Sequence, residues 1–155
     1  LCQSAQLGGL IVPNFSIGAC LMMHCAATAA QFFPNATITE THHLDKKDAP
    51  SATALATAAS IQKARKNAPL PHHSTETHTG SLGACAHDVP IHAIRMPGAL
   101  ASQTVLMGLP GETFSLTHHT QDRSAFMPGI CLACQHVSTL SELVIGLDSL
   151  LNLNP

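Results

Sequence analysis

The spacing of apolar residues along the chain predicts alternating strands and helices. β-Branched residues alternate with polar ones over residues 36–42, which predicts a strand in which side chains two positions apart share a face. Ile38, Glu40 and His42 should therefore point to one side of that strand. Three further strands are predicted, which with the first make a four-stranded sheet: residues 91–96, 103–107 and 113–119.

Helical patterns surround these strands. Apolar runs predict helices over residues 17–33 and 126–137, and an Ala-rich run predicts a third over residues 52–64, with Ser51 as its N-cap. Leucine and valine recur at helical spacing over residues 140–151, which predicts an amphipathic last segment. The pattern therefore predicts a four-stranded sheet accompanied by helices.

Three stretches qualify that outline. The first helical run is apolar nearly all round, but His24 and Gln31 within it favour a core or interface helix over a membrane span. Residues 10–12 predict the end of a buried strand. Residues 69–87 are rich in Pro, His, Ser, Thr and Gly, which predicts a long irregular segment.

Composition narrows the class of protein. The 155 residues suit one domain, and only 10% are charged, against roughly 25% in ordinary soluble domains. We therefore expect part of the surface to be buried in an oligomer or against a missing domain. A net charge of −2 and the lack of Trp and Tyr argue against a nucleic-acid partner. The chain does not begin with methionine, so we expect a fragment of a longer protein.

The cysteines allow two interpretations. Four of the six lie in apolar helical runs, where free thiols behave as small buried hydrophobes, and this favours a reducing, cytosolic setting; they are Cys20, Cys25, Cys131 and Cys134. A zinc site is the alternative, because Cys131-x-x-Cys134 is followed by His136, and Cys85 with His87 would complete a set of ligands. Cys131 and Cys134 fall on a predicted helix, whereas a zinc knuckle normally occupies a turn.

Most of the candidate chemistry lies between the strand at 36–42 and the helix at 52–64. The intervening loop carries two imidazoles and two ammonium groups: His42, His43, Lys46 and Lys47. The helix that follows offers unpaired backbone N–H groups and a partial positive charge at Ser51, Ala52 and Thr53, which suits a carboxylate or a phosphate. A solvated loop followed by an ordinary N-cap is the alternative interpretation.

The same loop carries a family signature. The pattern Glu40-x-His42-His43-x-x-Lys46-x-Asp48-Ala49-Pro50-Ser51-x-Thr53-Ala54 resembles the substrate-site signature of the 4-hydroxy-tetrahydrodipicolinate reductases (dihydrodipicolinate reductases) of lysine and diaminopimelate biosynthesis. Pro13-Asn14-Phe15-Ser16-Ile17-Gly18 resembles the segment that links the two domains of these enzymes, and His78-Thr79-Gly80 resembles their central loop. The stretch from Leu116 to Gly129 is similar to their last strand and helix.

This resemblance implies a C-terminal substrate-binding and oligomerisation domain of the α+β class. Its helices would pack on one face of the mixed sheet, and its sheets would associate across subunits in a homotetramer. Residues 1–12 would end the missing N-terminal Rossmann domain, residues 13–137 would form the substrate domain, and residues 138–155 would return toward the nucleotide-binding domain. The full enzyme would be an NAD(P)H-dependent reductase of a cyclic dicarboxylate in the bacterial cytoplasm or the plastid stroma, with NADPH or NADH bound mainly by the absent domain. This fragment alone should be inactive, and neither nucleic acid nor membrane is an expected partner.

The resemblance also implies residue roles. His42 would donate a proton or orient the donor, and Lys46 would supply the proton or stabilise developing charge; neither role is assigned to one of them alone. The substrate carboxylates would be held by His43, Ser51, Ala52 and Thr53. The cofactor side would be contacted by Asn14, Phe15 and Arg95.

Two departures from the family pattern accompany these roles. Ala52 stands where the family usually has glycine, and a methyl group there is unfavourable if the backbone needs a positive φ. Ala101-Ser102-Gln103 replaces a usual Gly-Glu-His. An oligomerisation domain with a decayed site is therefore a further alternative.

Overall fold

A strand that ends at His42 occupies the centre of a five-stranded sheet. The computed structural model describes residues 7–153, and β2 (Asn35–His42) is the middle strand of the order β3-β4-β2-β5-β6. β2 runs parallel to β4 (Val89–Arg95) and antiparallel to β5 (Ala101–Leu109), so the sheet is mixed. β6 (Glu112–Thr120) pairs with β5 at one edge. The α+β class predicted from sequence is confirmed.

The strand count was predicted one too low. The fifth strand is β3 (Ala84–Ala86), a short edge strand that pairs antiparallel with β4 and lies within the segment expected to be irregular. Its three residues are too few to show a period, so its pairing with β4 rather than its own pattern makes it a strand.

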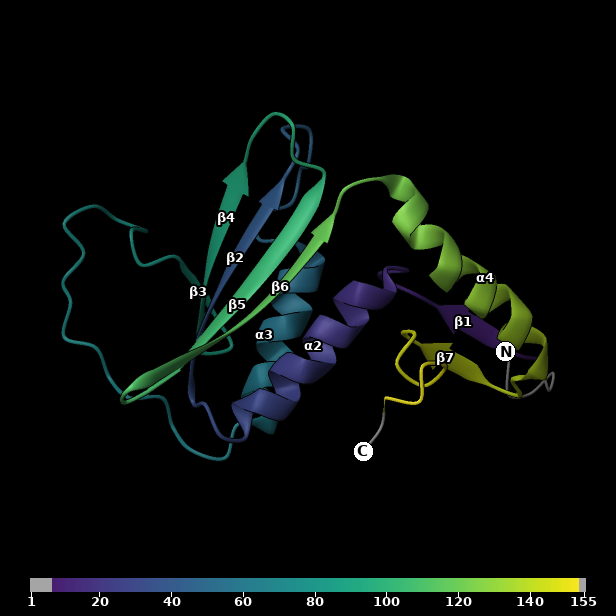
Figure 1. Ribbon diagram of the computed structural model, residues 1–155, viewed down its shortest axis with the longest axis horizontal. Coiled ribbons are helices and arrows are strands. Elements are labelled where there is room, and N and C mark those ends of the chain that lie inside the picture. Colours follow the sequence, from purple (N-terminus) through teal and green to yellow (C-terminus); the bar gives the residue numbers. More distant parts are fainter. Residues whose placement is uncertain (1–6, 154–155) are drawn as a thin grey trace. The chain divides into compact units, whose positions relative to one another are not determined.

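The alternation predicted for β2 places one row of side chains in the core. Ile38 and Glu40 are both fully buried, and their register partners on β5 are Val105 and Gln103, which are also buried. Two helices, α2 (Ile17–Ala30) and α3 (Ala52–Ala64), lie against this face of the sheet (Figure 1). The core joins small residues from the helices to branched residues from the strands: Met22, Ala26, Ala30, Ala54, Ala58, Ile61, Ile38, Val89, Ile91, Val105 and Met107.

The chain forms two compact units. The sheet unit comprises residues 22–121, and the terminal unit comprises residues up to 21 together with those from 122 onward. The predicted boundaries at residues 12/13 and 137/138 stay predictions, and residues 1–6 of the first predicted segment lie outside the described part. The terminal unit holds β1 (Gly9–Ile11), η1 (Arg123–Phe126), α4 (Met127–His136), η2 (Val137–Thr139) and β7 (Leu143–Ile145).

The helical prediction for residues 140–151 is wrong. Leu143, Val144 and Ile145 form β7, which pairs in parallel with β1, and Gly146 follows with φ +89°. The leucine and valine positions include a short apolar run that pairs with a parallel strand. Over so few residues, the spacing of such a run cannot be distinguished from helical periodicity. Leu147, which is buried, then anchors the closing turn.

The expectation for the helical cysteines holds at one position only. Cys20 is buried, and burial, followed by the charge of Asp148, raises the pKa of its thiol to about 11. Cys25, Cys131 and Cys134 are exposed, because α2 and α4 each bury only part of their circumference. Across residues 7–153, no three side chains of His, Cys, Asp or Glu are grouped closely enough to hold a metal ion.

Residues 71–82 are exposed throughout and have no regular secondary structure, as predicted. Within the described part of the chain, no helix has the length and apolarity needed to cross a membrane.

Candidate functional site

A buried carboxylate organises the end of the sheet where β2 and β4 terminate. Glu40 has no exposed side-chain surface and receives a bidentate pair from Arg95, with Nη1 donating to Oε2 at 2.9 Å and Nη2 to Oε1 at 3.0 Å. His42 Nδ1 lies 2.5 Å from Oε2, and the backbone N–H of Ser51 donates to Oε1 at 3.1 Å. Both carboxylate oxygens are therefore fully engaged by groups from three segments of the chain.

The charge state of Glu40 follows from these partners. Burial alone raises the pKa of a carboxyl group, but the hydrogen bonds from Arg95 and His42 and their positive charges outweigh burial and hold the pKa of Glu40 below its usual value. Glu40 is thus an anion at neutral pH.

Arg95 also fastens the loop that follows β2. Its Nη2 donates to the carbonyl of Asp48 at 2.6 Å, and its Nη1 donates to the carbonyl of Ile94 at 2.7 Å. The backbone N–H of Met96, the next residue, donates to the carbonyl of His42 at 3.1 Å. The loop is therefore held at both ends by the end of β4.

The cationic side of the loop carries an internal ion pair. Lys46 Nζ donates to Asp48 Oδ1 at 2.7 Å, with 22% of the lysine side chain exposed. This hydrogen bond lowers the pKa of Asp48, and backbone N–H groups, including that of Ala52, lower it further. A carboxylate of the protein itself thus lies between the lysine and the start of α3, where the sequence predicted an external anion.

The start of α3 was predicted correctly. Ser51 is the N-cap, its Oγ accepts from the N–H of Ala54 at 3.2 Å, and its own N–H is taken by Glu40. Ala52 is the first helical residue and is exposed, and it is not among the residues with positive φ, so alanine here needs no strained backbone. Thr53 is half-buried in the first turn, and its carbonyl accepts from Thr57 Oγ1 at 2.8 Å.

The sequence-predicted site residues fall into two groups. Those from β2, the loop, α3 and β4 lie in the sheet unit, and the bonds described above connect most of them; His43 is half-buried beside His42 in this group. Asn14 and Phe15 lie in the terminal unit. There, Asn14 Oδ1 accepts from the N–H of Ser16 at 2.9 Å, and a side chain on Gly129 of α4 would collide with the carbonyl of Phe15.

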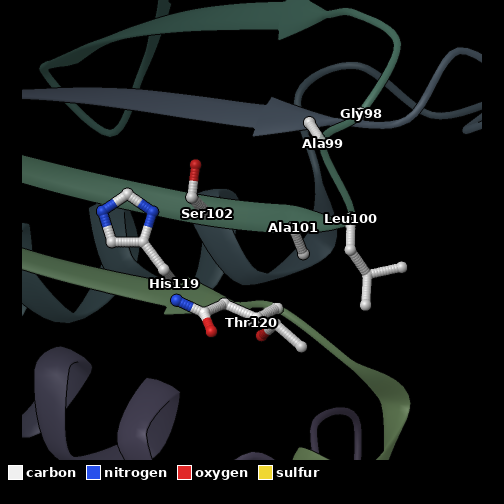
Figure 2. Close-up of a pocket in the computed structure, with 8 residues that line it drawn as sticks. Gly98, Ala99, Leu100, Ala101, Ser102, His119 and Thr120 are labelled. Atoms are coloured by element: carbon white, nitrogen blue, oxygen red, sulfur yellow. The ribbon is translucent and has the colours of Figure 1, made fainter.

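A cavity opens at the same end of the sheet. It has a volume of about 430 Å³ and is lined by the β4–β5 connection and the facing ends of β5 and β6, with Ser102 and His119 as cross-strand neighbours (Figure 2). Ala101, in its wall, is the register partner of His42. Cavities of roughly 300–1,000 Å³ typically hold small molecules, so the space beside the histidine strand is adequate for one.

Sequence reasoning assigned no role to Glu40 or Asp48, although both stood in the signature. The available signal was the alternation of β2, which placed Glu40 on the same face as buried Ile38. A charge on the buried face of a strand needs a partner, but the pattern cannot name Arg95, which lies 55 residues further along the chain.

Comparisons with known proteins show which family the chain belongs to. A family model described as "Dihydrodipicolinate reductase, C-terminus" matches residues 18–151. The 4-hydroxy-tetrahydrodipicolinate reductase of Legionella pneumophila (strain Corby) is 51% identical over 151 residues, which is 97% of this chain and 62% of that protein. The enzyme of the same name from Moorella thermoacetica is 46% identical over 152 residues, covering 97% of this chain and 57% of the relative.

A solved structure is similar to the same extent. The dipicolinate-bound dihydrodipicolinate reductase from Paenisporosarcina sp. TG-14 has a TM-score of 0.85 and 41% identity, covering 96% of this chain and 56% of that one. The chain spans about 60% of the length of the curated relatives it matches. By the extent of the family match, this chain belongs to the dihydrodipicolinate reductase family and corresponds to its C-terminal domain.

Proposed function

We propose that this chain is the substrate-binding half of an NAD(P)H-dependent reductase that converts 4-hydroxy-tetrahydrodipicolinate to tetrahydrodipicolinate. The observation that carries the proposal is the loop after β2, in which His42 is held by a buried carboxylate and Lys46 bonds to Asp48 shortly before the Ser51 N-cap of α3. The related structure that contains dipicolinate supports a cyclic dicarboxylate as the ligand class. The intact contacts around Glu40 favour this function over a decayed oligomerisation domain.

In this proposal the chain supplies binding groups and a proton. His42 donates the proton or orients its donor, and Lys46 supplies the proton or stabilises developing negative charge. His43 and the first turn of α3 at Ala52 and Thr53 hold the carboxylates. Ser51 contributes by capping that turn, because its N–H is bound to Glu40 and its hydroxyl accepts from α3.

The hydride comes from NADPH or NADH, which we propose is bound mainly by a domain outside this chain. Asn14 and Phe15, in the terminal unit, are proposed to lie beside the nicotinamide. For Arg95 the bonds to Glu40 and Asp48 engage both terminal nitrogens, so its contact with the cofactor is the less supported of these assignments.

We also propose that the sheet associates with copies of itself in a homotetramer. Leu106 and Ile94 are 43% and 39% exposed and lie on the face of the sheet opposite the core. Threonine hydroxyls surround them, with Thr104 and Thr117 3.2 Å apart across β5 and β6. A face with few charges and exposed branched residues is suited to pack against a second sheet.

The free state of Cys20 and Cys85, as of the other described cysteines, supports a cytoplasmic location.

Titration calorimetry with pyridine-2,6-dicarboxylate, which is dipicolinate, tests the site. Lys46→Ala and His43→Ala should each weaken binding by about tenfold or more, since a hydrogen bond to a charged group contributes about 1.5–3 kcal/mol. His72→Ala and His73→Ala are matched controls, because these adjacent histidines lie in the exposed segment and should not change the affinity. Equal affinity of all four variants and the parent would contradict the site assignment.

A second assay tests the division into halves. The purified chain alone should not oxidise NADPH in the presence of substrate, because we propose that the hydride donor is bound mainly by a domain outside this chain. Steady NADPH oxidation by the chain alone would contradict that division.

A further inference from the structure

We propose that Glu40 is a positioning residue that fixes the imidazole of His42 with its proton on Nδ1, so that Nε2 is the atom that exchanges a proton with the ligand. The inference rests on the proposed function for the meaning of that exchange. The assignment of the nitrogen itself depends only on the contacts inside the sheet unit.

The assignment follows from what each group can donate. An ionised carboxylate only accepts hydrogen bonds, so the nitrogen that lies 2.5 Å from Glu40 Oε2 must carry the hydrogen. In neutral His42 the hydrogen is then on Nδ1 and Nε2 presents a lone pair. In the protonated ring, Nε2–H is the remaining donor. Both forms keep the Glu40 contact, so the ring does not need to turn when it gains or loses a proton.

Arg95 makes a buried carboxylate possible at this position. An unpaired anion with no exposed surface would be strongly unfavourable, and the bidentate guanidinium provides the compensating charge with two parallel hydrogen bonds. The same guanidinium binds the carbonyl of Asp48, and Glu40 binds the N–H of Ser51. One ion pair therefore sets the direction of the imidazole and also holds the part of the loop that follows Lys46.

The exposure of the ring agrees with this role. The His42 side chain is 16% exposed, so most of the ring is covered while part of it reaches the surface. Carboxylates orient imidazoles in proton-transfer sites in the same way: the carboxylate binds one ring nitrogen, and part of the ring stays exposed.

Nitrogen-15 NMR of the histidine side chains in the full 155-residue chain tests the proposal directly. In the neutral ring of His42 we expect a one-bond proton coupling at Nδ1 and none at Nε2. A parent spectrum in which neutral His42 carries its proton on Nε2 would overturn the proposal without any variant.

Two substitutions each remove one carboxylate charge: one from a residue that contacts the His42 ring, and one from a residue that bonds elsewhere. Glu40→Gln should remove the preference for Nδ1–H, because a carboxamide can donate to Nδ1 as well as accept from it. Asp48→Asn removes one negative charge from the same loop, and Asp48 bonds to Lys46 rather than to His42, so it should leave the His42 pattern unchanged. An unchanged His42 pattern in Glu40→Gln would contradict the positioning role.

A further variant addresses the case in which Glu40→Gln does not fold. Arg95→Lys keeps a positive charge but loses the bidentate geometry, and it should broaden or shift the His42 resonances while Nδ1 stays protonated. If the parent chain does not bind the dicarboxylate, the proposed function is refuted, and the assignment of the proton to Nδ1 of His42 still stands. The opposite nitrogen pattern with normal dicarboxylate binding would refute the positioning role alone.

Discussion

The chain contains three adjacent pairs of histidines, at residues 42–43, 72–73 and 118–119, and the first two lie in different surroundings. His42 ends a central strand, and its Nδ1 lies against a buried carboxylate, whereas His72 and His73 lie in a segment in which residues 71–82 are exposed throughout. In the printed sequence the two pairs look alike. A histidine pair is therefore a candidate site only where the fold brings a buried partner, such as the carboxylate of Glu40, into contact with one of its rings.

The loops that carry the two pairs are also held differently. The loop after β2 is bound to β4 through Arg95 and Met96, which belong to a distant part of the chain. The exposed segment is organised locally by Glu76, whose carboxylate accepts from the N–H groups of Gly80 and Leu82 at 3.1 and 2.8 Å. The first loop should therefore lose its structure only with the sheet, and the second should open independently.

The largest expected effect is on stability. Glu40→Ala should lower the free energy of unfolding by about 3 kcal/mol, because it leaves Arg95 largely buried, with 18% of its side chain exposed, and without its carboxylate. Urea unfolding monitored by circular dichroism measures the change. Glu76→Ala removes an exposed carboxylate from the other loop and should shift the midpoint far less. Equal shifts would remove the distinction between the two loops.

The second effect is the pH dependence of the same contact. The pKa of Glu40 is depressed below its ordinary value of 4.5 in the folded chain, so its stabilisation is fully present above about pH 4.5 and is lost as the pH falls through the lower folded value. The difference in unfolding free energy between the parent and Glu40→Gln should be constant near neutral pH and shrink in acid. A difference that grows in acid would mean that the pKa is raised instead.

A smaller effect concerns the helix start beside the first histidine pair. Ser51→Ala removes the side-chain acceptor for the N–H of Ala54 and should cost about 1 kcal/mol of stability in the same urea assay. Ser60→Ala, within the same helix α3, changes a serine that is not the cap and is the matched control. A cost as large for Ser60→Ala would show that capping is not the cause.

The smallest expected effect is on ligand affinity. Asp48→Asn removes the intramolecular partner of Lys46, and we expect dipicolinate to bind about two- to fivefold more tightly, the range for an exposed ion pair. Calorimetry of the parent and variant measures the ratio. Weaker binding in Asp48→Asn would indicate that Asp48 holds Lys46 in place for the ligand and does not compete with it.

Local patterns predicted much of the fold. The helix over residues 52–64 and its Ser51 cap were found at the correct residues, because capping depends on neighbours in sequence. The strand ending at His42 was found because alternation is itself local. The short strands β3 and β7 were missed, since pairing with another segment rather than their own spacing makes them strands.

The candidate site divides in the same way. The signature loop and the face of β2 that carries Glu40 and His42 were readable from sequence, because a strand's side chains alternate with a fixed period. The pairing of Glu40 with Arg95 was not readable, and neither was the occupation of Ser51 N–H by that carboxylate. The first depends on β4 lying next to β2 in parallel, and the second on the loop folding back so that Ser51 reaches the carboxylate.

The sequence by itself determined which candidate groups for anion binding and proton transfer this protein has, and it placed them on one strand, one loop and one helix start. The tertiary structure decided which of them are held and how. Burial of Glu40 requires a partner charge, and only the parallel pairing of β2 with β4 brings Arg95 to it. That long-range pairing separates the histidine pair at 42–43 from the one at 72–73.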